Sequence, residues 1–292
     1  MAMKKTMFVL CLIAAGTGVF ASGSLRVVAS IIPLYNITAA IAGDRAGLVC
    51  MVPPGASPHT FNPKPSQIKS LADAELFIQA GAGFEFWAPK LIKASGNKKL
   101  KVLSVTDGIK LEEEAGHEEE QGHHAESGNP HVWLDPVLVK DFSVKICAAL
   151  SELRPADRKY FEGNLKKFGA QLDALDIYFK KETSKFYVKE IVSFHPAWVY
   201  FEKRYGLTEV GVIQATPGRE ATPKELKNII LQIKKYGIKT IFAEPQLPRK
   251  AADVIAKEAG VNVLIIDPNG EADGDYIGFM KKNFDVMKEA MK

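Results

Sequence analysis

The stretch KTIFAEPQLPRKAADVIAKEAGVNVLIID, residues 239–267, contains the pattern that decides the fold. It begins with the apolar run 239–244 and ends with the apolar run 261–267, and between them we predict a helix at about 248–259. Runs that are apolar at nearly consecutive positions are typical of strands covered by helices on both faces of a parallel sheet. The stretch therefore predicts a strand–helix–strand unit with two parallel strands.

The same alternation of apolar runs and helical segments extends outward along the chain. Further strands are predicted at 26–30, 47–52, 76–81, 100–105, 190–195 and 208–213. The helix after the last of these begins at Thr222, which can cap it, with Pro223 at the first helical position and Glu225 placed to return the capping bond. Four predicted strands thus lie in each half of the chain. We expect an α/β protein with two lobes, each a mostly parallel four-stranded sheet flanked by helices.

Between the two halves lies a long helical segment, residues 155–186. Its apolar residues recur at steps of three and four and mark one face: Phe161, Leu165, Phe168, Leu172, Leu175 and Phe179. A helix of about 30 residues spans about 45 Å. We therefore expect a rigid connection between an N-terminal lobe at 22–154 and a C-terminal lobe at 187–292. The alternative is a helix packed within one large domain.

Residues 1–21 have the three parts of a secretory signal peptide. Lys4 and Lys5 form a basic start, an apolar run extends from Met7 to Ala15, and small residues precede a cleavage site near Ala21. The apolar run is shorter than the roughly 20 residues of a transmembrane helix. We therefore expect export and cleavage, which places the mature protein in the periplasm. The alternative is a buried first helix of the mature fold.

The charge balance argues against nucleic acid as a partner. The chain of 292 residues has a formal net charge of +4, and removal of Lys4 and Lys5 would leave about +2. So weak and dispersed a charge lacks the basic patch that nucleic-acid binding requires.

Residues 112–128, EEEAGHEEEQGHHAESG, differ in composition from the rest of the chain. The segment is rich in Glu and Gly, contains His117, His123 and His124, and has no Lys or Arg. Since it has no apolar face to bury, we expect a surface loop. Its negative charge would attract cations and recruit metal weakly. The alternative is a solvated acidic linker.

Five side chains of metal-ligand type adjoin prolines. They are His59, His131, His195, Glu244 and Asp267. His195, Glu244 and Asp267 each end a predicted strand, and in open parallel sheets ligand sites lie beyond the carboxyl ends of the strands. A set of imidazoles with one carboxylate suits zinc, and also manganese or iron(II). The alternative is that each histidine is an ordinary polar residue.

These residues lie in segments that resemble a known family. The segments 51–87, NPHVWLDP (129–136), SFHPAWVYFEKRYG (193–206), IFAEPQ (241–246) and IIDP (265–268) are similar to the ligand regions of zinc- and manganese-binding proteins of metal ABC transporters, the ZnuA/TroA-like group. The match covers nearly the whole mature chain in order. The resemblance implies two lobes bridged by a long helix, with the metal in the cleft between them.

The resemblance also implies roles for individual residues and partners. It implies four ligands: His59, His131, His195 and Asp267. Glu244 would lie beside the ligands or serve as an alternative ligand. The histidines of 112–128 would recruit metal, although this loop is shorter than the His-rich insertion typical of zinc-selective members. The implied function is capture of zinc by a monomeric exported protein and delivery to an ABC permease with its cytoplasmic ATPase.

Three other functions remain as alternatives. A manganese- or iron(II)-binding member of the same family would use the same ligands. An exported adhesion protein with a structural metal is a second alternative. A metal-dependent hydrolase is a third, but the sequence has no HExxH helix, and a four-ligand site would leave no position for a catalytic water. We therefore expect a binding protein and not an enzyme.

Overall fold

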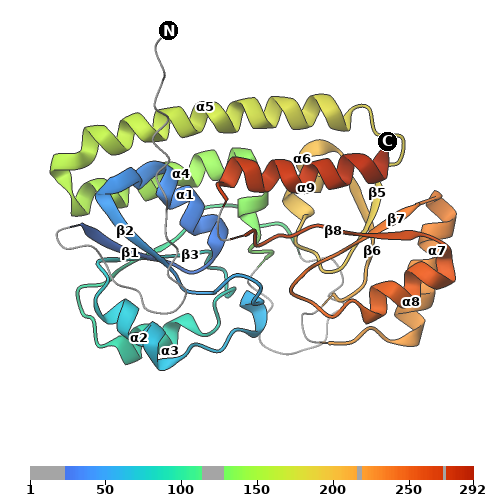
Figure 1. Ribbon diagram of the computed structural model, residues 1–292, viewed down its shortest axis with the longest axis horizontal. Coiled ribbons are helices and arrows are strands. Elements are labelled where there is room, and N and C mark those ends of the chain that lie inside the picture. Colours follow the sequence, from blue (N-terminus) through green and yellow to red (C-terminus); the bar gives the residue numbers. More distant parts are fainter. Residues whose placement is uncertain (1–23, 114–127, 216–218, 272–273) are drawn as a thin grey trace, which may run out of the picture.

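The computed structural model describes residues 24–113, 128–215, 219–271 and 274–292. Two α/β units lie side by side, and the long helix α5 runs across both of them (Figure 1). The predicted signal peptide, residues 1–21, and the loop histidines His117, His123 and His124 lie outside the described residues. No helix in the described ranges combines the length and the apolar character needed to cross a bilayer.

The N-terminal lobe contains one parallel sheet in the order β2-β1-β3-β4. Its strands are β1 (Leu25–Ala29), β2 (Ala46–Cys50), β3 (Leu76–Gln79) and β4 (Lys101–Ser104). Its helices are α1 (Ile32–Ala42), α2 (Pro65–Ala72), α3 (Ala88–Ser95) and α4 (Pro136–Leu153). Helices α1 and α4 lie on one side of the sheet, and α2 and α3 lie on the other (Figure 1). Consecutive apolar residues therefore mark strands covered on both faces, as predicted.

The C-terminal lobe also has four strands, but they pair differently from the expected single sheet. They are β5 (Glu190–Ser193), β6 (Thr208–Val212), β7 (Thr240–Ala243) and β8 (Asn262–Ile265). Among the described residues, backbone hydrogen bonds join them as two parallel pairs, β5–β6 and β7–β8, and β5 lies against β7. The strands are short, and the register of the β5–β6 pair shifts between Ile191 and Val192. The register shift, and not strand length, distinguishes this lobe from the first, whose strands are equally short.

Helices cover these strands on both sides. They are α6 (Val199–Tyr205), α7 (Pro223–Tyr236), α8 (Lys250–Ala259) and α9 (Tyr276–Met291). Helices α6 and α9 lie on the side of α5, and α7 and α8 lie on the opposite side (Figure 1). The capping box predicted for α7 is present, because Thr222 Oγ1 accepts from the Glu225 amide and the Glu225 carboxylate accepts from the Thr222 amide. The α/β class with two lobes is confirmed.

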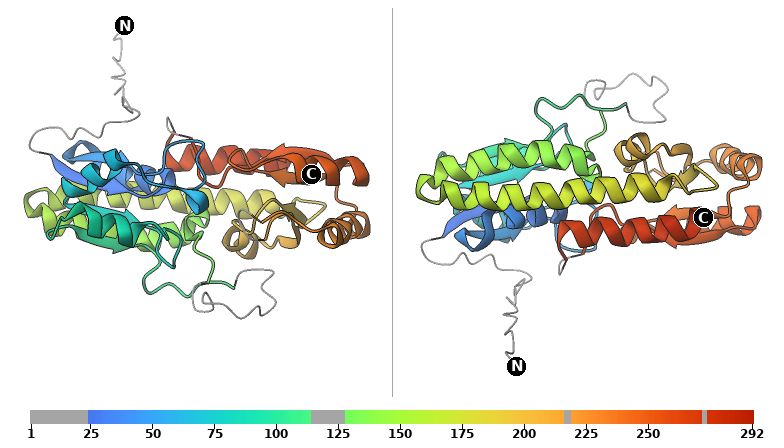
Figure 2. Two further views of the ribbon diagram at one scale, coloured as in Figure 1. Left: turned by 90° about the horizontal axis from the view of Figure 1, so that it is seen from below. Right: turned by 90° about the horizontal axis from the view of Figure 1, so that it is seen from above.

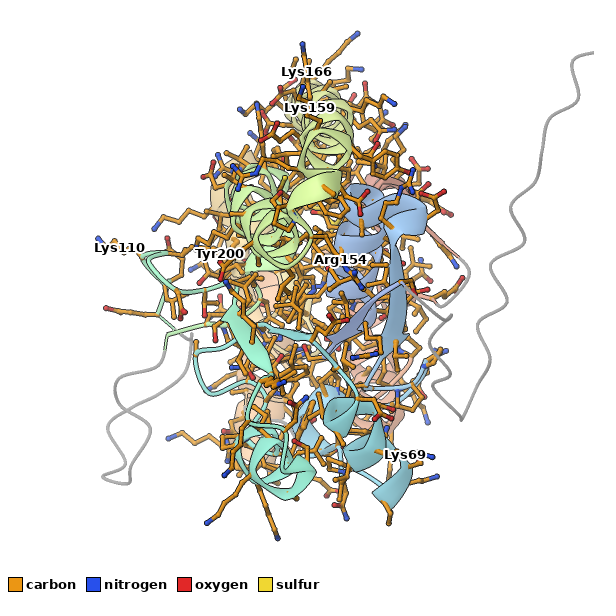
Figure 3. The ribbon with its side chains drawn as sticks, turned by 90° about the vertical axis from the view of Figure 1, so that its left-hand side faces the viewer. Lys69, Lys110, Arg154, Lys159, Lys166 and Tyr200 are labelled. Atoms are coloured by element: carbon orange, nitrogen blue, oxygen red, sulfur yellow. The ribbon has the colours of Figure 1, made fainter. Side chains whose placement is uncertain are left out.

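Helix α5 (Arg158–Thr183) is the long helix expected between the lobes, and a short turn at 155–157 precedes it. Its 26 residues span about 39 Å. It packs against α1 and α4 in the first lobe and against α6 and α9 in the second (Figure 2). Lys159 and Lys166 lie on its outer side, away from the sheet (Figure 3).

The apolar face of α5 joins the two lobes into one core. Phe161, Phe168, Leu172, Leu175 and Phe179 are buried, and they belong to a hydrophobic cluster that also includes residues of both lobes. Close packing resists sliding of the elements on either side. The core therefore favours a fixed arrangement of the lobes over a wide hinge motion.

Candidate metal centre

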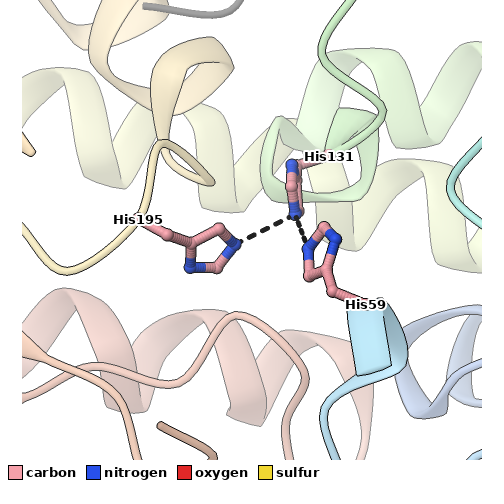
Figure 4. A group of neighbouring side chains, drawn as sticks. All are labelled: His59, His131 and His195. Carbon is pink, nitrogen blue, oxygen red and sulfur yellow. Dashed lines mark hydrogen bonds between the residues drawn. The ribbon is translucent and has the colours of Figure 1, made fainter. Parts of the chain in front are cut away.

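Three histidines converge at the boundary of the lobes. His59 lies in a 3-10 turn (Pro58–Thr60) that follows β2, His131 directly precedes the 3-10 turn Val132–Leu134, and His195 lies two residues after β5. The Nε2 atom of His131 is 3.3 Å from Nε2 of His59 and 3.2 Å from Nε2 of His195 (Figure 4). One ligand atom from each histidine lies within 4.8 Å of the others.

The spacing of these nitrogens fits a tetrahedral zinc ion. With zinc–nitrogen bonds of about 2.0–2.1 Å, two nitrogens of a tetrahedral site lie about 3.3–3.4 Å apart. The two Nε2–Nε2 distances at His131 are 3.3 and 3.2 Å. The side chains therefore stand close to a metal-binding geometry without further movement of the backbone.

Hydrogen bonds at the Nδ1 atoms fix the orientation of the His131 and His195 rings. His131 Nδ1 lies 2.9 Å from Asn129 Oδ1, and His195 Nδ1 lies 2.5 Å from Glu244 Oε1. Both oxygens accept, so each Nδ1 carries a proton, and in the neutral ring of His131 the lone pair of Nε2 faces the centre. The 3.2 Å contact between Nε2 of His131 and Nε2 of His195 is a hydrogen bond when one of the two atoms carries a proton, and a bound cation would replace that proton. The donor set thus fits a bound metal ion.

Burial keeps the imidazoles of His59 and His131 neutral. Desolvation, followed by the electrostatic effect of His195, lowers the pKa of His59 to about 3, although part of its surface reaches solvent. The same causes, with His59 added, hold the pKa of His131 well below its usual value. A metal ligand must be unprotonated. At neutral pH the site can therefore accept a cation without first losing protons from His59 and His131.

Asp267 was predicted as the fourth ligand, but its carboxylate is engaged elsewhere. Its Oδ1 accepts from Gln246 Nε2 at 2.7 Å and from the amide of Asn269 at 2.8 Å. Among the described residues, the cluster of ligand atoms comprises the three histidines and does not include Asp267. The residue lies at the end of β8, at the expected edge, but local hydrogen bonds hold its side chain. The structure therefore brings together three of the four predicted ligands.

Glu244 lies behind His195 and is not one of the clustered ligands. Its side chain and that of His195 are 2% and 3% exposed, so this hydrogen bond is shielded from water. A carboxylate in this position orients the imidazole and raises its basicity. This geometry corresponds to the first of the two roles considered for Glu244 from the sequence.

Two residues near the site were not identified from the sequence. Phe84 packs edge-on against His59 at a centroid distance of 4.8 Å and also contacts His131. Asn129, which is fully buried, hydrogen-bonds to the backbone and ring of His131. The sequence indicated the role of Asn129 only by its position, two residues before the predicted ligand His131. It contained no indication that Phe84 lies near the site.

Comparisons with known proteins give the chain a family. The family model described as zinc-uptake complex component A, periplasmic (ZnuA), matches residues 27–290. The chain is 32% identical to the high-affinity zinc uptake system protein ZnuA of Bacillus subtilis, over 91% of this chain and 88% of that protein. It is 30% identical to the zinc-binding lipoprotein AdcA of Streptococcus pneumoniae, over 96% of this chain but 58% of AdcA.

A solved structure agrees with these sequence matches. The crystal structure of a ZnuA deletion mutant with zinc bound is similar with a TM-score of 0.83 and 30% identity, covering 92% of this chain and 98% of that one. The family resemblance noted in the ligand-bearing segments is thus confirmed over most of the chain. Because the family model extends from β1 to the last turn of α9, this protein belongs to the ZnuA family of periplasmic zinc-uptake components.

Proposed function

We propose that this protein is an exported solute-binding protein that captures zinc between its two lobes and delivers it to an ABC permease. The observation that carries the proposal is the convergence of three histidines, in which Nε2 of His131 lies at tetrahedral spacing from Nε2 of His59 and from Nε2 of His195. Zinc-binding relatives of the same family support the choice of cargo.

The donor atoms favour zinc over manganese. Imidazole nitrogen suits zinc, whereas manganese prefers carboxylate, carbonyl and water oxygens. The clustered ligands are three imidazoles, and the oxygen ligand implied by the family resemblance, Asp267, is held by Gln246 and Asn269. We propose that the fourth zinc position is taken by water or by Asp267 after release of these hydrogen bonds.

The family, rather than the number of ligands, favours transport over catalysis. Three histidines with an open fourth position are also the ligands of some catalytic zinc sites. Four ligands were expected from the sequence, and the cluster has three, so ligand number alone no longer argues against a hydrolase. The matched relatives are zinc uptake and zinc-binding proteins. Turnover of ester, amide or phosphate substrates by the zinc-loaded protein would contradict the transport function.

Location and partners follow from the same function. We propose that residues 1–21 direct export and are removed, that the mature protein acts in the periplasm as a monomer, and that its partner is a permease with a cytoplasmic ATPase. The acidic segment 112–128, with His117, His123 and His124, would raise the local cation concentration around the protein.

The experiment that tests this function compares metals on the mature chain. Protein purified without added metal is analysed by inductively coupled plasma mass spectrometry and then titrated with zinc against manganese in a competition assay. We expect one zinc per chain and tighter binding of zinc than of manganese. A His195→Ala variant is the control, because it removes one Nε2 donor. Tighter manganese binding, or zinc binding that survives this substitution unchanged, would contradict the proposal.

A further inference from the structure

We infer that Asn129 is a positioning residue that sets the tautomer of His131 and ties the His131 segment to the His195 segment across the lobe boundary. The inference rests on the proposed metal-binding function. Asn129 is fully buried, lies in the first lobe directly before the Pro130-His131 dipeptide, and reaches a carbonyl of the second lobe. Its role would be to prepare two of the three histidines before the metal arrives.

The orientation of the Asn129 amide is fixed by its partners. Oδ1 lies 3.0 Å from the backbone amide of His131, which can only donate. Nδ2 lies 2.5 Å from the carbonyl oxygen of Pro196, which can only accept. These two bonds are satisfied together in one orientation of the amide, with oxygen toward His131 and nitrogen toward Pro196.

This orientation decides which nitrogen of His131 is protonated. The ring Nδ1 of His131 lies 2.9 Å from the same Oδ1. An amide oxygen accepts and does not donate, so Nδ1 must carry the hydrogen, and Nε2 is left with its lone pair toward the other two histidines (Figure 4). Without this acceptor, the ring is free to adopt the other tautomer, in which Nε2 carries a proton and cannot bind metal.

The same residue fastens the two ligand-bearing segments to each other. Pro196, which accepts from the side chain, directly follows His195. The backbone carbonyl of Asn129 accepts from the hydroxyl of Tyr200 at 2.5 Å, and Tyr200 lies on α6, which follows the His195 turn. Side chain and main chain of Asn129 therefore both hold the His195 segment. The separation of His131 and His195 is set by protein contacts and does not require the metal.

A merely structural asparagine would give a different set of results. If Asn129 only stabilised the loop, its removal would lower the free energy of unfolding but leave the His131 tautomer unchanged. Asn97 provides a matched control, because its Nδ2 donates to the carbonyls of Leu71 and Ala74 at 2.9 and 2.7 Å in the first lobe, away from the histidines. Asn97→Ala loses similar amide–carbonyl bonds without touching the site.

The experiment uses Asn129→Ala and Asn129→Asp in the full mature chain, with wild type and Asn97→Ala beside them. Zinc affinity is measured by competition with a chelator, and the tautomer of His131 is read from long-range ¹H–¹⁵N NMR spectra of the metal-free protein. A carboxylate at position 129 keeps an acceptor for His131 but loses the donor to Pro196. The Asp variant therefore separates the effect on the His131 tautomer from the effect of losing the hydrogen bond to Pro196. It remains informative where the Ala variant does not fold.

We expect Asn129→Ala to lose about 10–100-fold in zinc affinity, the range typical of residues that orient metal ligands, and to show a mixed His131 tautomer. Asn129→Asp should keep the Nδ1-protonated tautomer and bind zinc more tightly than the Ala variant, and Asn97→Ala should bind as wild type does. The inference would be overturned if Asn129→Ala bound zinc as tightly as wild type. It would also be overturned if Asn129→Ala kept the wild-type His131 tautomer and Asn129→Asp bound zinc no more tightly than Asn129→Ala. Failure of the wild-type protein itself to bind zinc would instead overturn the proposed function.

Discussion

Replacing Glu244 by glutamine tests how much the carboxylate behind His195 contributes to metal affinity. Glu244 Oε1 lies 2.5 Å from His195 Nδ1, and both side chains are almost fully buried. Glutamine keeps the shape and can still accept from Nδ1 through its carbonyl oxygen. It removes the negative charge that strengthens this bond and raises the basicity of the Nε2 lone pair.

The size of the effect follows from this burial. A hydrogen bond to a charged group contributes about 1.5–3 kcal/mol, against about 0.5–1.5 kcal/mol for a neutral one. The difference of about 1–1.5 kcal/mol corresponds to roughly 5–13-fold in affinity. Residues that support metal ligands in this way typically account for about 10–100-fold. We therefore expect Glu244→Gln to weaken zinc binding by about tenfold, and by more where the buried negative charge also attracts the cation directly.

The assay is a chelator competition titration of the mature protein at neutral pH, with Glu182→Gln as the control. Glu182 is also a largely buried carboxylate, near the end of α5, but it pairs with Lys185 and Lys292. Its substitution removes charged hydrogen bonds without touching His195. Unchanged affinity in Glu244→Gln, or an equal loss in Glu182→Gln, would refute the reasoning.

Three further predictions concern the ligands, the pH dependence and the fold. Asp267→Asn should lower zinc affinity less than His59→Ala does in the same titration, because Oδ1 of Asp267 is already held by Gln246 and His59 presents Nε2 to the cluster. The pKa of His59 is about 3 in the folded protein and about 6.5 in an unfolded chain, so the contribution of neutral His59 to the stability of the metal-free protein is fully present above pH 6.5 and is lost as the pH falls toward 3. Urea unfolding between pH 7.5 and 4.5 should show this loss, and His59→Gln should reduce it. Thr222→Ala should lower the free energy of unfolding by about 1 kcal/mol, because it removes the side chain that caps α7. Equal urea midpoints for this variant and the wild type would contradict the prediction.

The sequence was sufficient for the elements that repeat a simple pattern. Each predicted strand is present, because buried parallel strands require consecutive apolar residues and leave a clear pattern. The long helix was predicted at 155–186 and extends from Arg158 to Thr183, since its apolar face is regular but its ends depend on local turns. The division of the C-terminal strands into two pairs, β5–β6 and β7–β8, was not predictable, because it depends on how the strands are placed in three dimensions.

The sequence predicted where the candidate ligands lie in the fold, but not how their side chains are oriented. Strand ends and neighbouring prolines placed His195, Glu244 and Asp267 at one edge of the C-terminal lobe. Which side chains point toward the histidine cluster depends on hydrogen bonds between residues far apart in sequence, such as Gln246 with Asp267. The role of Asn129 was not predictable for the same reason, because its hydrogen-bond partner Pro196 is 67 positions away in the sequence.

The most direct test of the metal centre is zinc K-edge X-ray absorption on the mature protein loaded with one equivalent of zinc. The arrangement of His59, His131 and His195 predicts three imidazole ligands with zinc–nitrogen distances of about 2.0–2.1 Å, completed by one light atom. Substitution of any one of the three histidines by alanine should remove one imidazole from the scattering pattern. A spectrum with fewer than three imidazoles in the wild-type protein, or with a sulfur ligand, would contradict the proposed site.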